Sequence, residues 1–250
     1  YDADMSGVIA IGDAIPTMGA LEKLLMAKNK MGTTKSGKAL GMALSKNTVL
    51  KELDVSVNKY FNNGWKTDPG FASEIANGIN NNGAIATVNI MGNNIGKEQV
   101  SKLKDMITAP PTLVSLCGIA DNATEVDLSG LQMNASDAAI LADELPAKRA
   151  LTSLNISNNN IGQIVGWKDY GPLSDSEACG SAYSEAPDNH RYTHTDGRHQ
   201  AELLEGDELG KPEGFIAIVN AIPTMGKIAY LNIRRNGRLD EAAYEALRNM

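Results

Sequence analysis

Residues 151–161, LTSLNISNNNI, decide the fold of this 250-residue chain. Apolar residues stand at the first, fourth, sixth and eleventh positions of the stretch, and Asn159 stands at the ninth. The alternation of Leu154 and Ile156 across Asn155 is typical of a short strand with one buried face. The amide of Asn159 can hydrogen-bond backbone groups in the turn that follows. The stretch therefore predicts a strand and then a tight turn.

The same spacing recurs along the chain. Full copies are LEKLLMAKNKM from Leu21, LKELDVSVNKY from Leu50, IATVNIMGNNI from Ile85 and IAYLNIRRNGR from Ile228. A weaker copy, ATEVDLSGLQM, starts at Ala123 and has Leu131 at its ninth position. We number the positions of each copy from 1 to 11. Stacked copies predict a ladder of buried structural asparagines at position 9, namely Asn29, Asn58, Asn93, Asn159 and Asn236.

Between the copies the apolar spacing becomes that of an amphipathic helix. In GFASEIANGI the residues Phe71, Ile75 and Ile79 fall on one face. A second helical segment is expected to begin with Ser136 as its N-cap. Each unit is thus predicted to be a strand, a turn, a helix and a return loop.

The hexapeptide AIPTMG occurs twice, at residues 14–19 and 221–226, within the similar stretches VIAIGDAIPTMG and FIAIVNAIPTMG. Proline disfavours helical geometry at the residue before it, and glycine permits a turn. Each copy therefore predicts the end of a helix and the turn into the next strand. The first of these helices is expected to place Ile11 and Ile15 on its inner face.

The copies resemble leucine-rich repeats, and their long form resembles the ribonuclease-inhibitor-like type. The resemblance implies an α/β leucine-rich-repeat solenoid, a short arc with parallel strands on the inner curve and helices outside. It implies one domain over residues 1–250, with residues 162–214 as a long acidic insertion. The segment Leu113–Ile119 fits less well, because too few residues separate it from the next copy for a parallel crossover. It either lies outside the parallel sheet or pairs in the opposite sense.

The insertion carries eleven acidic and four basic residues, a charge equal to the net −7 of the whole chain. Loops of this length within a compact domain are often functional or disordered. Its Asp196–Gly197 pair predicts a two-residue hairpin over residues 191–202. His194 would then face His199 across the hairpin. These residues and His190 are candidates for a metal site or a pH-sensitive contact, but the spacing fixes no third ligand, so a solvated hairpin with a polar face is the favoured interpretation.

Composition narrows the function classes. A net charge of −7 argues against a nucleic-acid partner, and no apolar run reaches the length of a membrane span. Two cysteines, Cys117 and Cys179, favour a reducing intracellular or organellar compartment, and no targeting segment is recognisable. No phosphate loop, H-E-x-x-H motif or nucleophile elbow is present, so neither enzymatic activity nor a cofactor is predicted. Cys117 is interpreted as a small apolar residue of a repeat.

Variable residues beside the strand leucines are expected to face the inner curve. The candidate partner-binding residues are Lys23, Lys28, Glu52, Asp54, Asn89, Met91, Asp127, Asn155, Tyr230, Asn232, Arg234 and Arg235, with Trp167 in the insertion. Their mixed charge suits a protein partner, with Tyr230 and Arg234 the best anchors by residue type. A solvated face that binds nothing predicts the same set.

The leading hypothesis is a non-catalytic protein-protein interaction module or accessory subunit that binds another protein through the inner face and the insertion. Some proteins with this repeat type activate small GTPases, so a GTPase-activating or other enzyme-regulating role is an alternative. There Arg234, Arg235 and Asn232 would stabilise the transferring phosphate. A metal- or pH-responsive binding protein that uses the histidine hairpin is a further alternative.

Overall fold

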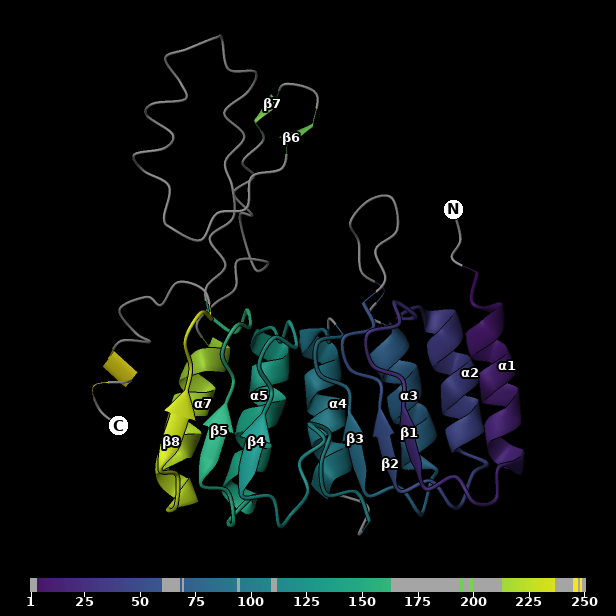
Figure 1. The fold of residues 1–250 in the computed structure, drawn as a ribbon, viewed down its shortest axis with the longest axis horizontal. Helices are drawn as coiled ribbons and strands as arrows, with labels where there is room; N and C mark the ends of the chain where they lie inside the picture. The colour runs from purple at the N-terminus through teal and green to yellow at the C-terminus, as the bar shows by residue number, and fades with distance from the viewer. Residues whose placement is uncertain are drawn as a thin grey trace.

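The computed structural model describes residues 4–59, 68, 70–93, 95–108, 112–162, 194–195, 198–199, 213–236, 245–246 and 248. In this part of the chain the fold is mixed α/β, with six α-helices and two parallel three-stranded sheets. Figure 1 shows the strands of both sheets in one layer and the helices in a second layer, each following chain order. Segments that follow one another in sequence are therefore neighbours in space.

The strands and helices have the following bounds. The first sheet contains β1 (Lys23–Leu25), β2 (Glu52–Asp54) and β3 (Thr87–Asn89), and the second contains β4 (Glu125–Asp127), β5 (Ser153–Asn155) and β8 (Tyr230–Asn232). The helices are α1 (Ser6–Ala14), α2 (Thr34–Leu44), α3 (Gly70–Asn80), α4 (Lys97–Thr108), α5 (Ala135–Glu144) and α7 (Glu213–Met225). Short 3₁₀ turns, η1 (Ile15–Thr17) and η2 (Leu145–Ala147), follow α1 and α5. All six strands lie where the eleven-residue copies predict them.

The strands pair in the register that the copies predict. Residues at position 4 stand opposite one another in two rows, Leu24–Leu53–Val88 and Val126–Leu154–Leu231. Leu53, Val88 and Leu154 are buried, so this side of the strands faces the core. Burial of one such side chain contributes about 1.5–3 kcal/mol relative to leaving it exposed. The alternation of buried and accessible residues leaves positions 3 and 5 on the outer side of the strand layer.

The helix layer packs closely where glycines meet. A Cβ built on Gly78 of α3 would lie 2.2 Å from the carbonyl oxygen of Gly41 in α2, so only glycine allows this approach. The predicted core face of Phe71, Ile75 and Ile79 is confirmed, because all three side chains are buried. The predicted N-cap of α5 is wrong by two residues. Its cap is Asn134, whose side chain accepts hydrogen bonds from the N–H groups of Ser136 and Asp137.

The two AIPTMG copies end their helices differently. Helix α1 stops at Ala14 and a 3₁₀ turn continues through Pro16, as predicted, whereas α7 runs through Pro223. Ile15 is buried, but Ile11 is 41% exposed, so the prediction that Ile11 lies on an inner face is wrong. The physical reason is that no helix among the described residues covers that side of α1.

The asparagine ladder is built as predicted at four of its five positions, where Asn58, Asn93, Asn159 and Asn236 are buried; the prediction is wrong for Asn29, which is exposed. Nδ2 of Asn58 donates to the carbonyls of Met26 and Val55, and Oδ1 of Asn58 accepts the backbone N–H of Asn29 at 2.7 Å. Asn93 accepts the backbone N–H of Asn58 in the same way. The later rungs donate equivalently, Asn159 to Leu128 and Ile156 and Asn236 to Ile156 and Ile233. These asparagines satisfy buried backbone groups and are structural.

The segment Leu113–Ile119 joins the first sheet. Ser115 forms a parallel bridge with Thr87 of β3, and Cys117 forms an antiparallel bridge with Asn89. The chain then turns at Gly118, whose φ is +73°. The segment therefore starts in the parallel sense and ends by turning away. No helix separates it from β4 in the described residues, and the two sheets are distinct there.

Charged side chains fill the junction between the two sheets. Glu144 accepts hydrogen bonds from the hydroxyl of Ser115 at 2.6 Å and from the N–H of Leu116 at 2.5 Å. Nζ of Lys148 donates to the carbonyl of Val114 at 2.8 Å. Glu144 is 2% exposed and Lys148 is 1% exposed. Polar backbone groups of the segment Leu113–Ile119 are thus hydrogen-bonded by side chains from α5 and from the residue after η2.

A second buried carboxylate lies at the other end of the junction. Oδ1 of Asp137 accepts the N–H of Gly92 at 3.1 Å, and Nζ of Lys59 donates to the carbonyl of Gln132 at 3.0 Å. Burial raises the pKa of Asp137 to about 6, opposed by its hydrogen bonds and by the charge of Lys59. Burial likewise lowers the pKa of Lys59.

Candidate protein-binding surface

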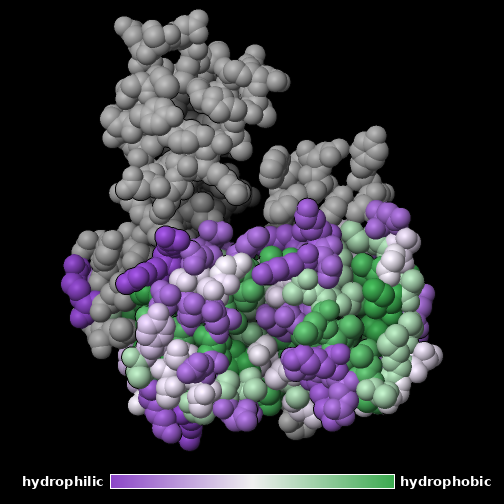
Figure 2. Space-filling model, viewed as in Figure 1, coloured by the Kyte–Doolittle hydropathy of each residue, from purple (hydrophilic) through white to green (hydrophobic). Residues whose placement is uncertain are grey.

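The outer side of the strand layer is the surface that the sequence singled out. Pairing places the side chains of positions 3 and 5 in rows that cross each sheet. The position-3 rows are Lys23–Glu52–Thr87 and Glu125–Ser153–Tyr230, and the position-5 rows are Leu25–Asp54–Asn89 and Asp127–Asn155–Asn232. We call these twelve residues the strand face. Figure 2 shows hydrophilic and hydrophobic residues intermixed on this side of the molecule, with a larger hydrophobic area over its N-terminal half.

Two large apolar side chains of the strand face are exposed. Leu25 in β1 is 60% exposed and Tyr230 in β8 is 55% exposed. They belong to the first strand of one sheet and the last strand of the other. Between them the strand face is polar, and Lys23 forms a 2.6 Å ion pair with Glu52. Such a surface offers apolar contact at its ends and hydrogen-bonding groups in its middle.

Most residues at position 5 also hold the turn after their strand. Side-chain Oδ1 of Asp54, Asn89, Asp127, Asn155 and Asn232 accepts the backbone N–H of the residue two positions on. This is the turn-forming bond that Asp and Asn make with their own backbone. Two hydrogen bonds from Ser129 hold the pKa of Asp127 below its usual range. The one from the Ser129 side chain has the larger effect, and the one from the backbone N–H has the smaller. The predicted partner residues at position 5 therefore have a structural role as well.

This turn explains why Met91 was wrongly assigned to the surface. The period-two pattern places position 7 on the same side as positions 3 and 5, yet Met91 is fully buried, with its sulfur 3.7 Å from that of Cys117. Ser56 and Ser157, which also stand at position 7, are buried too. The side chain at position 5 accepts a hydrogen bond from the backbone N–H of position 7. The chain therefore turns there, and the alternation of buried and exposed side chains ends before position 7. Met91 is a core residue.

Position 8 adopts a left-handed backbone in all six copies. The φ angles are 63° at Lys28, 54° at Val57, 71° at Gly92, 65° at Gly130, 57° at Asn158 and 56° at Arg235. This conformation is uncommon outside glycine and asparagine. The candidate residues Lys28 and Arg235 thus project from the turn at the end of their strands. Both are exposed, as is Arg234.

The insertion contributes one described element. His194–Thr195 (β6) pairs in antiparallel fashion with Arg198–His199 (β7), and His194 stands opposite His199. This is the pairing that the Asp196–Gly197 turn predicts. The candidates His190 and Trp167 lie outside the described residues. Within those ranges, no group of three or more His, Cys, Asp and Glu residues is placed to hold a metal ion.

Cys117 is a core residue, as interpreted from the sequence. Its side chain is 1% exposed, and burial, with the nearby carboxylates Glu144 and Asp137, raises the pKa of its thiol well above the usual range. A thiol in that state is not a nucleophile at neutral pH.

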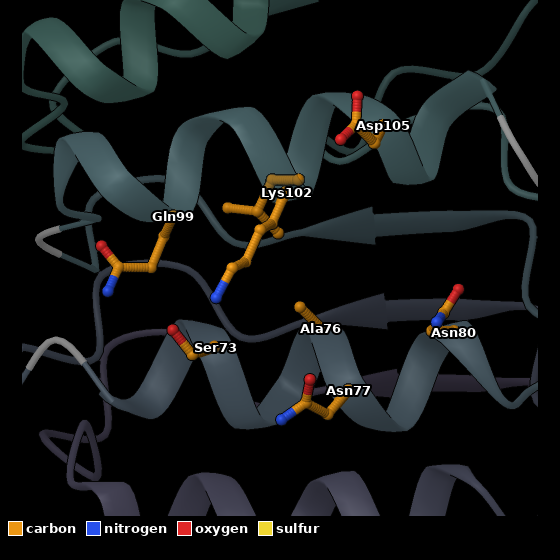
Figure 3. A pocket seen from close by; sticks show the side chains of 8 residues that line it. Ser73, Ala76, Asn77, Asn80, Gln99, Lys102 and Asp105 are labelled. Carbon is orange, nitrogen blue, oxygen red and sulfur yellow. The ribbon is translucent and has the colours of Figure 1, made fainter.

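A groove that the sequence did not reveal lies in the helix layer, between α3 and α4. Its volume is about 350 Å³, and it is lined by Ser73, Ala76, Asn77, Asn80, Gln99, Lys102, Leu103 and Asp105. Figure 3 shows Lys102 extending from α4 towards α3 across this space. Small residues of α3 leave the space open, in contrast to the glycine contact between α2 and α3. The lining presents the hydroxyl of Ser73, three side-chain amides and the charged side chains Lys102 and Asp105.

Among the described residues, none of the helices combines the length and the apolar character needed to cross a bilayer. The chain matches no family model and no curated protein. One similar solved structure is the tropomodulin C-terminal domain of Caenorhabditis elegans. It has 7% sequence identity and a TM-score of 0.33, and the match covers 99% of this chain and 90% of that one. Neither the fold nor the surface described above rests on this likeness.

Proposed function

We propose that the chain is a leucine-rich-repeat solenoid of the ribonuclease-inhibitor-like type, and that it acts as a non-catalytic protein-binding module or accessory subunit. The repeat assignment is supported by strands in a common register, by the asparagine ladder and by the left-handed turn at position 8 of every copy. The features coincide at equivalent positions in copies that are far apart in sequence. Independent loops would not share them.

The observation that carries the binding proposal is the strand face. Two parallel sheets present rows of side chains at fixed spacing, and the rows include the exposed apolar groups Leu25 and Tyr230. Tyrosine is enriched at the centres of protein interfaces, since it combines a large apolar area with a hydroxyl group. Covering these side chains with a partner removes apolar surface from water, which favours association.

The proposed partner is another protein with mixed polarity. The strand face carries one cation, Lys23, and four carboxylates, those of Glu52, Asp54, Glu125 and Asp127, so its formal charge is −3 and basic groups on the partner would complement it. The acidic insertion would add a second, negatively charged contact. The absence of catalytic activity is part of the proposal. It is supported by the burial of Cys117 and by the turn-forming role of the position-5 carboxylates.

The test is retention of a partner by the immobilised chain from a native extract of its source, quantified by mass spectrometry. A stoichiometric partner should bind the wild-type chain and be lost from the double variant Leu25→Ser, Tyr230→Ser. The control is Met42→Ser, which removes a side chain that is 53% exposed on α2, in the helix layer. If no stoichiometric partner is retained, or if the double variant keeps it, the strand face is not the binding surface.

The alternative functions predict different measurements. A GTPase-activating role requires accelerated GTP turnover by a small GTPase that is lost in Arg234→Ala and Arg235→Ala. Both side chains are exposed, although Asn232 already bonds the N–H of Arg234 at 3.3 Å. A metal-responsive role requires a stoichiometric transition metal in elemental analysis of the purified chain.

A further inference from the structure

Two nearly identical helices of this chain have different surroundings. Residues 7–19 and 214–226 differ only at Val8/Phe215, Gly12/Val219 and Asp13/Asn220. The first stretch forms α1 and the turn after it, and the second forms most of α7. Helix α7 packs against α5, whereas α1 is the first helix of the layer (Figure 1). Identical side chains can therefore be compared with and without a preceding helix.

The glycine that starts each stretch shows the difference. A Cβ added to Gly214 would lie 2.6 Å from backbone atoms of Ala135 and 2.9 Å from the Cβ of Ala138, both in α5. Gly214 thus permits α5 to approach α7 closely. A Cβ added to the equivalent Gly7 would meet nothing within 4 Å. Helix α1 keeps the glycine needed for a close helix contact, but nothing described in the structure makes that contact.

The apolar residues that follow each glycine show the same difference. In α7, Ile218 is 1% exposed and Met225 is 4% exposed. Their equivalents in the first stretch, Ile11 and Met18, are 41% and 42% exposed.

The spacing places these residues on one side of their helix. Gly214, Ile218, Ala221 and Met225 follow one another at intervals of four, three and four residues, which is one stripe of an α-helix. That stripe is the side on which Gly214 meets α5. We call the matching residues of the first stretch, Gly7, Ile11, Ala14 and Met18, the α1 stripe. It is a complete copy of a helix-docking surface.

The strand layer is also open at this end. In the described residues β1 pairs with β2 on one side and with no strand on the other. Its counterpart β8 is instead paired with β5, in the register Ser153–Tyr230, Leu154–Leu231 and Asn155–Asn232. An unpaired strand edge is a template for addition of another strand.

The ladder ends in the same place. Oδ1 of Asn58 and of Asn93 accepts a backbone N–H from the preceding copy. Asn29 uses its amide nitrogen on its own turn, on the carbonyls of Met26 and Ala27, and its Oδ1 accepts no bond in the described residues. Within the described ranges, α1, β1 and Asn29 thus share one side on which no helix, strand or backbone N–H meets them.

We propose that the α1 stripe and the free edge of β1 form a second binding site, whose occupant is a helix–strand unit of a partner protein. The helix presents an alanine-lined face, as α5 does, and the following strand pairs in parallel with β1, as β5 does with β8. The chemistry of the occupant is defined by Ala135 and Ala138, which occupy the equivalent site on α7. This site lies on the side of α1 and β1 that faces away from α2 and β2.

The probe is a labelled synthetic peptide of residues 134–161, which contains α5 and β5 and therefore has the proposed chemistry. It is titrated against the full-length chain by fluorescence anisotropy. Saturable binding is expected, with at least tenfold weaker binding to the variants Gly7→Leu and Ile11→Asp. Met42→Asp, which alters an apolar side chain on α2 that is 53% exposed, should bind as the wild type does.

The variant Gly7→Leu separates binding from folding. Its side chain enters open space and replaces glycine in a helix, so the thermal midpoint should not fall. The matched variant Gly214→Leu must collide with the backbone of Ala135 and should lower the midpoint by several degrees. Equal binding of the peptide to wild type and Gly7→Leu, or no binding to either, would overturn the proposal.

Sedimentation of the chain without peptide tests the other occupant. If the chain self-associates and Gly7→Leu makes it monomeric, the occupant is a second copy and the proposal of a distinct partner is wrong. Leu25 and Tyr230 are unchanged in all four variants, Gly7→Leu, Ile11→Asp, Met42→Asp and Gly214→Leu. Failure of this site and failure of the strand face can therefore be distinguished.

Discussion

Buried backbone N–H and C=O groups are satisfied differently in two parts of the molecule. One is the regular step from one strand–helix unit to the next, which we call an ordinary step, and the other is the junction before β4. At the ordinary step from β2 to β3, backbone pairing and the neutral amide of Asn93 satisfy the buried polar groups. At the junction, the ionisable groups of Glu144 and Lys148 bond the N–H of Leu116 and the carbonyl of Val114. The amide of Asn93 does not titrate, whereas burial raises the pKa of Glu144, so only the second solution contains a group whose charge depends on pH.

The difference follows from a missing helix. The segment Leu113–Ile119 pairs with β3 through two isolated bridges, but no helix lies between it and β4, so β4 cannot be placed beside it by a regular crossover. Backbone groups at that edge need other partners, because an unpaired buried N–H or C=O is costly. The long side chains of Glu144, in α5, and Lys148, directly after η2, hydrogen-bond them. The junction thus depends on a few side chains, whereas ordinary steps distribute the same task over the backbone.

The largest expected effect is the loss of Glu144. Glu144→Ala leaves the N–H of Leu116 and the hydroxyl of Ser115 buried without an acceptor, and Lys148 loses a nearby charge. We expect a loss of about 4 kcal/mol in the free energy of unfolding. Urea unfolding followed by circular dichroism measures it. The neighbouring control Asp143→Ala removes only an exposed ion pair with Lys104 and should cost less than about 1 kcal/mol. Equal midpoints for the two variants would show that the junction does not depend on Glu144.

The next effect is a pH dependence of stability that arises from Asp137 at the junction. The pKa of Asp137 is about 6 in the folded chain, above the value of about 4 for an exposed aspartate. The folded state therefore binds this proton more tightly than the unfolded state does. Its contribution to stability is complete below pH 4 and is lost as the pH rises to about 6, at about 1.4 kcal/mol per pH unit.

The measurement is the difference in unfolding free energy between the wild type and Asp137→Asn from pH 4.5 to pH 7. Carboxylates whose pKa is lowered, such as Asp68 and Asp127, act in the opposite direction but are common to both proteins. As the pH rises from 4.5 to 7, the free energy of unfolding of the wild type should fall by about 2 kcal/mol relative to that of Asp137→Asn. A constant difference would mean that Asp137 is ionised throughout.

A smaller effect is expected at an ordinary step. Asn58→Ala removes the donor to Met26 and Val55 and the acceptor for the N–H of Asn29. We expect a loss of about 2 kcal/mol at any pH between 5 and 8. The end residue Asn29 is exposed, so Asn29→Ala should cost less than about 1 kcal/mol in the same urea titration. Similar losses at both sites would contradict a buried ladder.

The sequence was sufficient for the ordinary steps because each one repeats. Apolar residues at positions 4 and 6 and asparagine at position 9 place a strand and a turn wherever they recur, and the position-4 residues align across both sheets. A polar residue three positions before the copy is a second signal that repeats in the sequence. Asn47 and Asn82 each stand three residues before position 1 of a copy, and their side-chain oxygens accept the backbone N–H of that position. Lys148 stands at the equivalent place before Leu151, and its Nζ donates to the carbonyl of Val114 at the junction.

The junction and the surface could not be predicted in the same way. Burial of Glu144 depends on a gap that only the three-dimensional pairing creates, since a glutamate near a helix end is normally solvated. Met91 was misplaced because alternation was extended through a turn that breaks it. The contrast between Ile11 and Ile218 is invisible in sequence, because identical residues differ only in which helix lies beside them.

The smallest predicted effect concerns strain at an ordinary step. Val57 has φ +54°, a conformation unfavourable for a β-branched residue, whereas the equivalent position 8 holds asparagine at Asn158 and glycine at Gly92. Val57→Asn should therefore raise the free energy of unfolding by about 0.5–1 kcal/mol, measured by urea titration. The matched change Val49→Asn, at a half-buried valine without positive φ, should not stabilise the chain. Stabilisation by both changes would point to the asparagine itself, and destabilisation at Val57 would mean that its packing outweighs the strain.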